Sequence, residues 1–217
     1  GWTDPGLAFD VALHLGTLVA VVAYFWRDWL ILMRHGLTGR RSREAVLFWY
    51  LVLATIPGAL AGWRLESYAE TVFRAPFLVG TMLIVMGGIL YLADQAKPRI
   101  KKLSDIKLLE ALLIGLAQAL AIIPGVSRSG ATIAAARLLS LEREAATRFS
   151  FLLSTPIIFG AGVMQLKDIT LADLNVPFLT GVGVSAVTGF LAIGFLLRYV
   201  TTRNFNIFVW YRVALGL

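Results

Sequence analysis

Between two of the most apolar segments of the chain lies a polar loop, Pro124-Gly125-Val126-Ser127-Arg128-Ser129-Gly130-Ala131-Thr132. An arginine embedded among apolar spans is costly unless it meets an anion or a wet cavity. The glycines and small side chains of the loop let backbone N–H groups approach a ligand, and its hydroxyl groups can donate hydrogen bonds. A helix predicted from Ala131 would add the positive end of its dipole. The loop therefore predicts an anion site within a membrane.

The composition of the chain predicts a polytopic membrane protein. Hydrophobic residues make up 58% of the 217 positions, and the mean hydropathy is +0.77, whereas soluble domains are about 45–50% apolar. The net charge of +7 does not predict nucleic-acid binding, because the basic residues cluster in short loops beside apolar segments, where membrane orientation and anionic lipids explain them. The absence of cysteine excludes thiol catalysis, thiolate metal sites and disulfides.

Apolar stretches separated by polar loops predict an all-α fold, a polytopic transmembrane helix bundle that forms one integral membrane domain over residues 1–217. Helices are expected because lipid leaves no other open structure that satisfies the backbone. The predicted helices cover residues 7–26, 45–63, 77–93, 108–123, 131–141, 149–166, 178–197 and a last stretch from 205. That last stretch is shorter than the about 20 residues of a span, and the chain opens without an initiator methionine, so a longer protein is expected.

The distribution of lysine and arginine predicts the orientation of the bundle. One set of loops holds 15 basic residues and the other set holds 3. The basic set comprises residues 27–44, 94–107, 137–148 and 198–203, and the other set comprises 64–75 and 167–176. The positive-inside rule places the basic set in the cytoplasm.

With this orientation the spans alternate only if residues 108–141 enter and leave the membrane on the cytoplasmic side. The sequence therefore predicts a re-entrant hairpin of two half-helices over these residues. The predicted helix 131–141 would be about 16 Å long, half of a bilayer core of about 30 Å. The 124–132 loop would then be the tip of the hairpin near mid-membrane, where irregular backbone is tolerated only around a cavity or inside protein.

The residues of this loop resemble the signature of a known family, the BacA-type undecaprenyl-pyrophosphate phosphatases or bacitracin-resistance proteins. The signature Pro-Gly-x-Ser-Arg-Ser-Gly-x-Thr is present from Pro124 to Thr132, and Gly115-Leu116-Ala117-Gln118 precedes it as in the family. Further resemblance covers residues 9–17, 25–27, 149–153 and 211–212, so it extends over nearly the whole chain. The family also carries a second, N-terminal re-entrant segment with a Glu-x-x-x-Glu pair and Pro-Val-Ser-Ser-Thr-Gly-His, which this sequence does not contain.

The resemblance implies hydrolysis of undecaprenyl pyrophosphate, a C55 isoprenyl lipid, to undecaprenyl phosphate and phosphate, which recycles the lipid carrier for cell-wall synthesis. It implies a multi-pass protein of the bacterial cell membrane, surrounded by membrane lipids, with its active site open to the extracytoplasmic side. It also implies a divalent cation, Mg²⁺ or Ca²⁺, whose ligands the family carries in the second re-entrant segment, so no metal ligand is assigned in this chain. The oligomeric state, including a homo-oligomer, stays open.

The resemblance also assigns roles to individual residues. Arg128 is expected to clamp the phosphates and, with Ser127, to belong to the catalytic centre, although no residue is named the nucleophile. Substrate contacts are expected from Gly125, Ser129, Gly130, Thr132 and Gln118. The alternatives are structural: Arg128 could pair with Glu110 or a backbone carbonyl, the hydroxyls could cap or join helices, and Gln118 could bond a neighbouring helix.

Three polar residues outside the loop keep more than one interpretation. Asp10 and His14 lie four positions apart on one predicted helix face, which suits a proton relay, a metal pair or simply an outward-facing helix end. Arg212 could reach the phosphates or extend to the membrane surface. Two small-residue series, Gly58/Gly62 and Gly181/Ser185/Gly189, predict helix-packing faces.

A different function class also fits the loop. Re-entrant half-helices around an anion site near mid-membrane are also how transporters bind substrate, so a transporter or flippase for an anionic lipid or phosphate is the alternative. The acid-phosphatase pattern Ser-Arg-x5-His is excluded, because the sixth residue after Arg128 is Ala134. A P-loop is excluded because no Gly-Lys-Ser/Thr follows the glycines.

Overall fold

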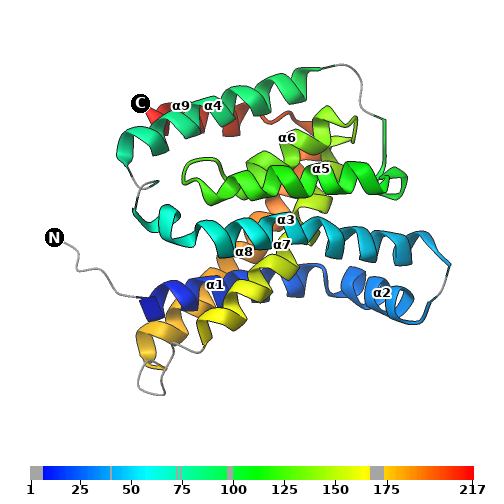
Figure 1. Ribbon diagram of the computed structural model, residues 1–217, viewed down its shortest axis with the longest axis horizontal. Helices are drawn as coiled ribbons and strands as arrows, with labels where there is room; N and C mark the ends of the chain where they lie inside the picture. The colour runs from blue at the N-terminus through cyan, green and yellow to red at the C-terminus, as the bar shows by residue number, and fades with distance from the viewer. Residues whose placement is uncertain (1–6, 40, 72, 74, 97–99, 167–173) are drawn as a thin grey trace.

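The computed structural model describes residues 7–217 apart from 40, 72, 74, 97–99 and 167–173 (Figure 1). Within these residues the regular structure is helical, with one isolated bridge between Lys101 and Leu141. The helices are α1 (Leu7–Tyr24), α2 (Trp26–Leu37), α3 (Arg43–Thr71), α4 (Pro76–Gln95), α5 (Leu108–Ala119), α6 (Arg128–Leu138), α7 (Arg143–Leu166), α8 (Val176–Thr202) and α9 (Asn206–Gly216). Two short 3-10 turns are η1 (Leu103–Asp105) and η2 (Leu120–Ile122). The predicted all-α fold is confirmed.

Several helices are long and apolar enough to cross a membrane. Four of them, α3, α4, α7 and α8, meet this criterion singly, and α1 with α2 meets it as a pair bent by 76°. These helices confirm a polytopic membrane bundle. α5 and η2 together form a shorter apolar segment over Leu108–Ile122, as expected of a half-helix.

Helix α2 corrects the sequence prediction, which placed a loop at residues 27–44. α1 stops before Phe25, and the chain continues as α2 in a new direction. α2 is amphipathic, because Leu32 and Gly36, one turn apart, are buried whereas the charged side chains of Arg27 and Arg34 are exposed. The charged residues on its polar face interrupt the apolar run, which is why the sequence alone suggested a loop.

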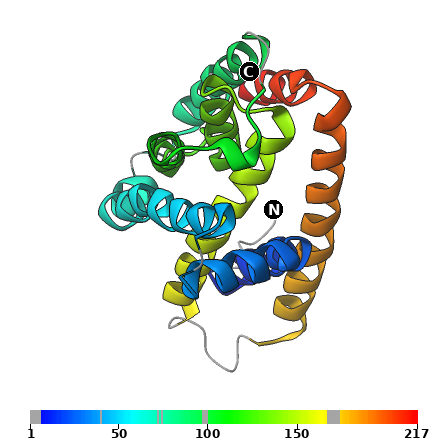
Figure 2. The ribbon, with the colours of Figure 1, turned by 90° about the vertical axis from the view of Figure 1, so that its right-hand side faces the viewer.

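Helices α1 and α8 pack closely through small residues. A Cβ atom at Gly16 would lie 2.4 Å from the carbonyl oxygen of Val182, so the two backbones approach at a distance that only glycine allows. Next to it, the hydroxyls of Thr17 and Ser185 are 3.1 Å apart. Figure 2 shows α8 running along one side of the molecule from α1 up to α9. The predicted packing role of the Gly181/Ser185/Gly189 series is confirmed by these contacts and by those of its glycines with α1.

The two ends of the 108–141 segment meet at one place. The N–H of Lys101 donates to the carbonyl of Ser140 over 3.1 Å, and the N–H of Glu142 donates to the carbonyl of Lys101 over 2.9 Å. The Lys101 ammonium also pairs with Glu110 in the first turn of α5. The chain therefore enters α5 and leaves α6 at the same end of the molecule, which is the geometry that a re-entrant hairpin requires. Its placement in a membrane stays a prediction.

The same end of the molecule holds a buried ionic cluster, the Asp94 cluster, formed by Asp94, Arg137, Arg143 and the backbone N–H of Phe205. Asp94 Oδ1 accepts from Arg137 Nε at 3.1 Å and from Arg143 Nε at 2.8 Å. Asp94 Oδ2 accepts from the N–H of Phe205 at 3.2 Å. One carboxylate thus joins the end of α4, the end of α6 and the starts of α7 and α9.

These pairs correct part of the charge interpretation. Arg137, Arg143 and Arg148 were assigned to a basic loop facing anionic lipid. The first two bind Asp94, and Arg148 pairs with Asp28 of α2. Each of these arginines has an acidic partner within the protein, although Arg137 and Arg143 share the single charge of Asp94.

Candidate functional site

The loop between η2 and α6 has an unusual backbone. Gly125 has φ +91°, and Ser127 has φ +62°, which is rare for a residue with a side chain. A Cβ atom at Gly125 would lie 2.4 Å from the carbonyl oxygen of Val79 in α4, so only glycine fits there. The Ser127 hydroxyl accepts from the N–H of Gly130 at 3.2 Å and caps α6. Strain of this kind gathers at sites whose surroundings enforce it.

The loop tip lies far from the Asp94 cluster along the length of the helices. Its neighbour Val79 lies fifteen residues before Asp94 in α4, about 22 Å along the helix. Gln118 touches Gly58, which lies fifteen residues after Arg43, the start of α3, again about 22 Å. The predicted helix 131–141 and the observed α6 both have 11 residues, about 16 Å, but α6 begins and ends three positions earlier. The remaining depth comes from the loop residues that precede α6.

Arg128 lines a cavity of about 640 Å³, the Arg128 cavity, enclosed by residues of α1, α3, α5, η2, α6 and α7. Its polar lining residues are His14, Thr17, Thr55, Gln118 and Arg128, and most of the remaining wall is apolar or glycine. Among the described residues, no carboxylate pairs with the Arg128 guanidinium. The predicted alternative partner Glu110 binds Lys101 and the N–H of Lys107 instead. The cavity therefore presents an uncompensated cation to whatever occupies it.

Gln118 is the second polar group of the cavity. Its side chain is only 3% exposed, and neither its amide nitrogen nor its amide oxygen has a hydrogen-bond partner in the described part of the chain. A buried amide without partners costs about 1–3 kcal/mol. The alternative in which Gln118 bonds a neighbouring helix is wrong, since Gly58 and Ile157 face it with no such bond. A ligand or water in the cavity can satisfy it.

The other predicted site residues lie beside the cavity. Gly125, Ser127, Ser129, Gly130 and Thr132 are absent from its lining. The Thr132 hydroxyl is fully buried between α6 and α7, bound to Ser150 Oγ at 2.7 Å and to the carbonyl of Arg128 at 2.9 Å. For Thr132 the structure thus favours the helix-joining interpretation. The hydroxyls of Ser127 and Ser129 are 3.4 Å apart.

Arg212 of α9 supports the loop from the side of α4. It is 8% exposed, and its Nη1 and Nη2 atoms lie 3.4 and 3.5 Å from the carbonyl oxygen of Val126. A Cβ atom on Gly130 would meet the same guanidinium at 2.8 Å, so glycine lets Arg212 approach. Arg212 neither lines the Arg128 cavity nor extends to the surface. Of the two residues left open on α1, His14 lines the cavity, whereas exposed Asp10 does not.

Thr17 and Thr55 are cavity residues that the sequence analysis missed. Each hydroxyl donates to a carbonyl four residues earlier in its own helix, at 2.9 and 2.7 Å. Their spacing in the sequence could have indicated them. Thr17 follows His14 by three residues and Gly58 follows Thr55 by three, so the two members of each pair share a helix face. Gly62 was predicted to pack against a helix, but it lines the cavity and has no atom within 4 Å of an added Cβ.

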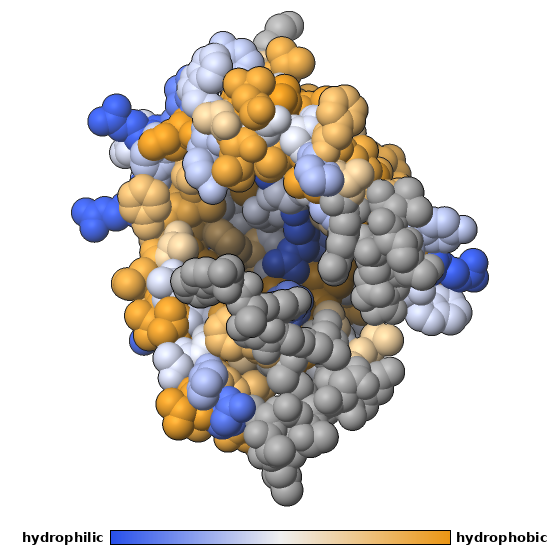
Figure 3. All heavy atoms as spheres, turned by 90° about the vertical axis from the view of Figure 1, so that its left-hand side faces the viewer, coloured by the Kyte–Doolittle hydropathy of each residue, from blue (hydrophilic) through white to orange (hydrophobic). Residues whose placement is uncertain are grey.

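The cavity opens away from the Asp94 cluster. Figure 3 faces the end of the molecule at which α3, α7 and α9 finish and α4 begins, and it shows a hollow with strongly hydrophilic atoms inside an apolar rim. Trp63 and Met164, near the ends of α3 and α7, contribute to the wall of the cavity.

The described residues do not form a metal site. In the described ranges no group of three or more histidine or acidic side chains could hold a metal ion. His14 is the one such residue that lines the cavity. Among the cavity residues, Arg128 offers a positive charge and Gln118 offers an amide that can form hydrogen bonds.

Comparison with known proteins agrees with the chemistry of this site. The sequence matches the family described as bacitracin resistance protein BacA over residues 1–217. It is 59% identical over 217 residues to the undecaprenyl-diphosphatase of Pelotomaculum thermopropionicum, covering 100% of this chain and 82% of that protein. The undecaprenyl-diphosphatase of Desulforudis audaxviator is 60% identical over 217 residues, covering 100% and 83%. That of Moorella thermoacetica is 52% identical over 215 residues, covering 99% and 82%.

Proposed function

The chain belongs to the family of the bacitracin resistance protein BacA, and on this basis we propose that it is an undecaprenyl-diphosphatase. It hydrolyses undecaprenyl pyrophosphate to undecaprenyl phosphate and inorganic phosphate. The three relatives described above, which carry this name, match 99–100% of the chain at 52–60% identity. One observation carries the proposal: Arg128 and Gln118 line the same largely apolar cavity. In the described part of the chain, Arg128 has no acidic partner and the Gln118 amide has no hydrogen-bond partner.

The residues of the site suit phosphoryl transfer, which depends mostly on positioning and charge neutralisation. In the reaction, the bond from the terminal phosphorus to the bridging oxygen breaks, water supplies the new oxygen, and the lipid monophosphate leaves with added negative charge. The Arg128 guanidinium can hold two phosphate oxygens as a planar fork and offset this charge. The Gln118 amide can donate to a third oxygen. Ser127 and Arg212 hold the loop backbone in place.

A divalent cation, Mg²⁺ or Ca²⁺, is part of this proposal as a requirement of the reaction. Such ions prefer carboxylate and carbonyl oxygens, and the described residues offer no carboxylate group at the Arg128 cavity. The described residues of the cavity therefore do not fit a divalent cation on their own.

We also propose that the protein lies in the bacterial cell membrane with the cavity open to the extracytoplasmic side. The loops of the opposite, Asp94 end carry most of the basic residues outside the spans, which favours a cytoplasmic location for that end. The apolar cavity wall, including Trp63, Ile157 and Met164, suits the isoprenyl part of the substrate. The pyrophosphate would then lie at Arg128.

A transporter or flippase remains the second candidate, because an anion cavity among short helices also serves transport. Turnover separates the two. Detergent-solubilised full-length protein with Mg²⁺ and farnesyl pyrophosphate, a short-chain soluble analogue, is expected to release phosphate continuously. Binding of the analogue without phosphate release by the wild type would contradict the enzyme and favour transport.

The same assay tests the site. Arg128→Ala is expected to reduce phosphate release by about ten- to a hundredfold or more, the loss of one charge-assisted contact. Arg198→Ala is the matched control, because Arg198 is an exposed arginine of α8 outside the cavity. A melting curve shows that each variant folds. Near-normal activity of folded Arg128→Ala would remove Arg128 from the site.

A further inference from the structure

A second pocket lies at the start of α3, at the end of the molecule opposite the opening of the Arg128 cavity. It has a volume of about 390 Å³ and lies between the first turns of α3 and the η1 segment. Its lining is Arg41, Ser42, Arg43, Val46, Leu47, Tyr50, Leu103, Ser104 and Ile106. We refer to it as the Arg41–Arg43 pocket. It shares no residue with the Arg128 cavity.

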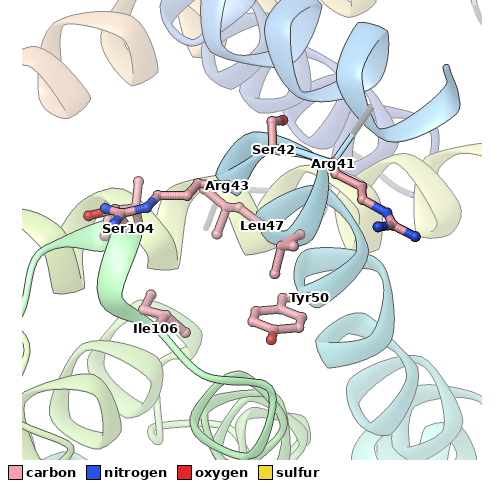
Figure 4. Close-up of a pocket in the computed structure, with 9 residues that line it drawn as sticks. Arg41, Ser42, Arg43, Leu47, Tyr50, Ser104 and Ile106 are labelled. Carbon is pink, nitrogen blue, oxygen red and sulfur yellow. The ribbon is translucent and has the colours of Figure 1, made fainter. Parts of the chain in front are cut away.

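The polar and apolar residues of this pocket are sorted along α3. Arg41, Ser42 and Arg43 form its polar mouth where α3 begins, next to Ser104 of η1. Val46, Leu47 and Tyr50 follow over the next two turns, about 10 Å into the helix. Figure 4 shows Arg43 reaching across to Ser104, with Arg41 on the other side, and Leu47, Tyr50 and Ile106 around the apolar part. A ligand that fits must carry its charge at one end and an apolar chain at the other.

The charge at the mouth is net positive. Arg41 and Arg43 are exposed, and in the described part of the chain neither forms an ion pair. Asp105 of η1 is an acidic side chain that interacts electrostatically with Arg43. The N–H of Lys102, and to a smaller degree the charge of Arg43, hold the pKa of Asp105 below its usual value, so Asp105 is ionised and offsets one positive charge. Glu44 is turned to His35 instead.

We infer that the Arg41–Arg43 pocket binds an acidic phospholipid of the leaflet that faces the Asp94 end, with its phosphate at the polar mouth, attracted by the charges of Arg43 and Arg41, and an acyl chain along Val46, Leu47 and Tyr50. Basic residues at a membrane surface attract anionic lipids by about 1 kcal/mol each, and arginine suits phosphate geometry. A free phosphate would use the mouth alone and leave the apolar part without a ligand. The inference is independent of hydrolysis at Arg128.

Native mass spectrometry of the purified full chain tests this inference with two probes of equal chain length, phosphatidylglycerol and phosphatidylcholine. The wild type is expected to retain phosphatidylglycerol in preference. In Arg41→Gln/Arg43→Gln the affinity for phosphatidylglycerol should fall about fivefold for each arginine removed. The control Arg198→Gln/Arg203→Gln makes the same charge change at exposed positions outside the pocket and should retain the lipid.

A second variant tests the apolar part without changing charge. Val46→Trp adds volume at a half-exposed lining position and should also reduce phosphatidylglycerol binding, while the melting temperature stays near that of the wild type. Equal binding of phosphatidylglycerol by wild type and both pocket variants would overturn the inference. Equal retention of phosphatidylcholine, or displacement of the lipid by millimolar inorganic phosphate, would overturn it as well, the latter in favour of a free-anion site.

Discussion

At the scale of single residues, the cavity separates groups that meet a ligand from groups that hold the loop. Arg128 and Gln118 face the cavity without described partners. The Thr132 hydroxyl is hydrogen-bonded to Ser150, and the Ser127 hydroxyl caps α6. Arg212 lies behind the loop against Val126. Substitutions of the first kind should therefore change activity, and those of the second kind should change stability or loop geometry.

Arg128→Lys separates charge from geometry. Lysine keeps the positive charge but loses the planar pair of donors, so phosphate release is expected to fall well below wild type while exceeding that of Arg128→Ala. The measurement is phosphate release from farnesyl pyrophosphate at saturating and limiting substrate. Full activity of the lysine variant would show that charge alone matters at this position.

Gln118→Leu should separate stability from activity. Both amide atoms of Gln118 are buried without partners, so replacing them with a similar apolar shape removes a desolvation penalty. The melting temperature is expected to stay constant or rise, and phosphate release is expected to fall about tenfold, the loss of one hydrogen bond to a charged ligand. A large fall in melting temperature would show instead that Gln118 is a structural residue.

At the scale of elements, the hairpin is held by its base. Lys101 bridges to the residues that follow α6, and the Asp94 cluster joins α4, α6, α7 and α9. The tip depends on close backbone contact, since Gly125 lies against Val79 of α4. An irregular loop can therefore remain in one conformation while presenting Arg128 to the cavity.

Asp94→Asn should destabilise the bundle strongly. Removing the buried carboxylate takes away the acidic group that Arg137 and Arg143 share, a loss of about 3 kcal/mol or more. Asp28→Asn is the matched control, because its pair with Arg148 is partly exposed and should contribute about 0–1 kcal/mol. Thermal unfolding in detergent measures both. Equal melting temperatures of the two variants would mean that the Asp94 cluster adds little.

At the scale of the whole molecule, the two ends differ in chemistry. One end carries the Asp94 cluster, the hairpin base and the Arg41–Arg43 pocket, and the other carries the opening of the Arg128 cavity. Because the chain has no cysteine, single cysteines report the orientation of these ends without background.

Cysteine labelling in intact cells tests the orientation. Arg41→Cys and Arg203→Cys, both at exposed positions near the Asp94 end, should react only with a reagent that enters the cytoplasm. Leu174→Cys, exposed before α8, should react with an impermeant reagent from outside. Labelling of position 174 from the cytoplasm alone would contradict both the re-entrant hairpin and the proposed extracytoplasmic opening.

The sequence by itself determined the helical bundle, the hairpin segment and the family signature, because hydropathy, charge bias and an arginine among apolar spans are properties of local composition. The helix α2 was the exception, since its charged face concealed an amphipathic period. Most helix boundaries differ from the prediction by a few residues, and α6 begins at Arg128 rather than at Ala131.

Only the tertiary structure decided which polar residues share the cavity. Arg128 and Thr132 both belong to the loop signature, and the sequence assigned both to the substrate site. In the structure Arg128 lines the cavity, whereas Thr132 is bound to Ser150 in the interface with α7. The partners of Asp94 lie 43, 49 and 111 residues away along the chain. Such contacts depend on how helices cross, and helix crossing is set by packing among distant residues, which no local pattern records.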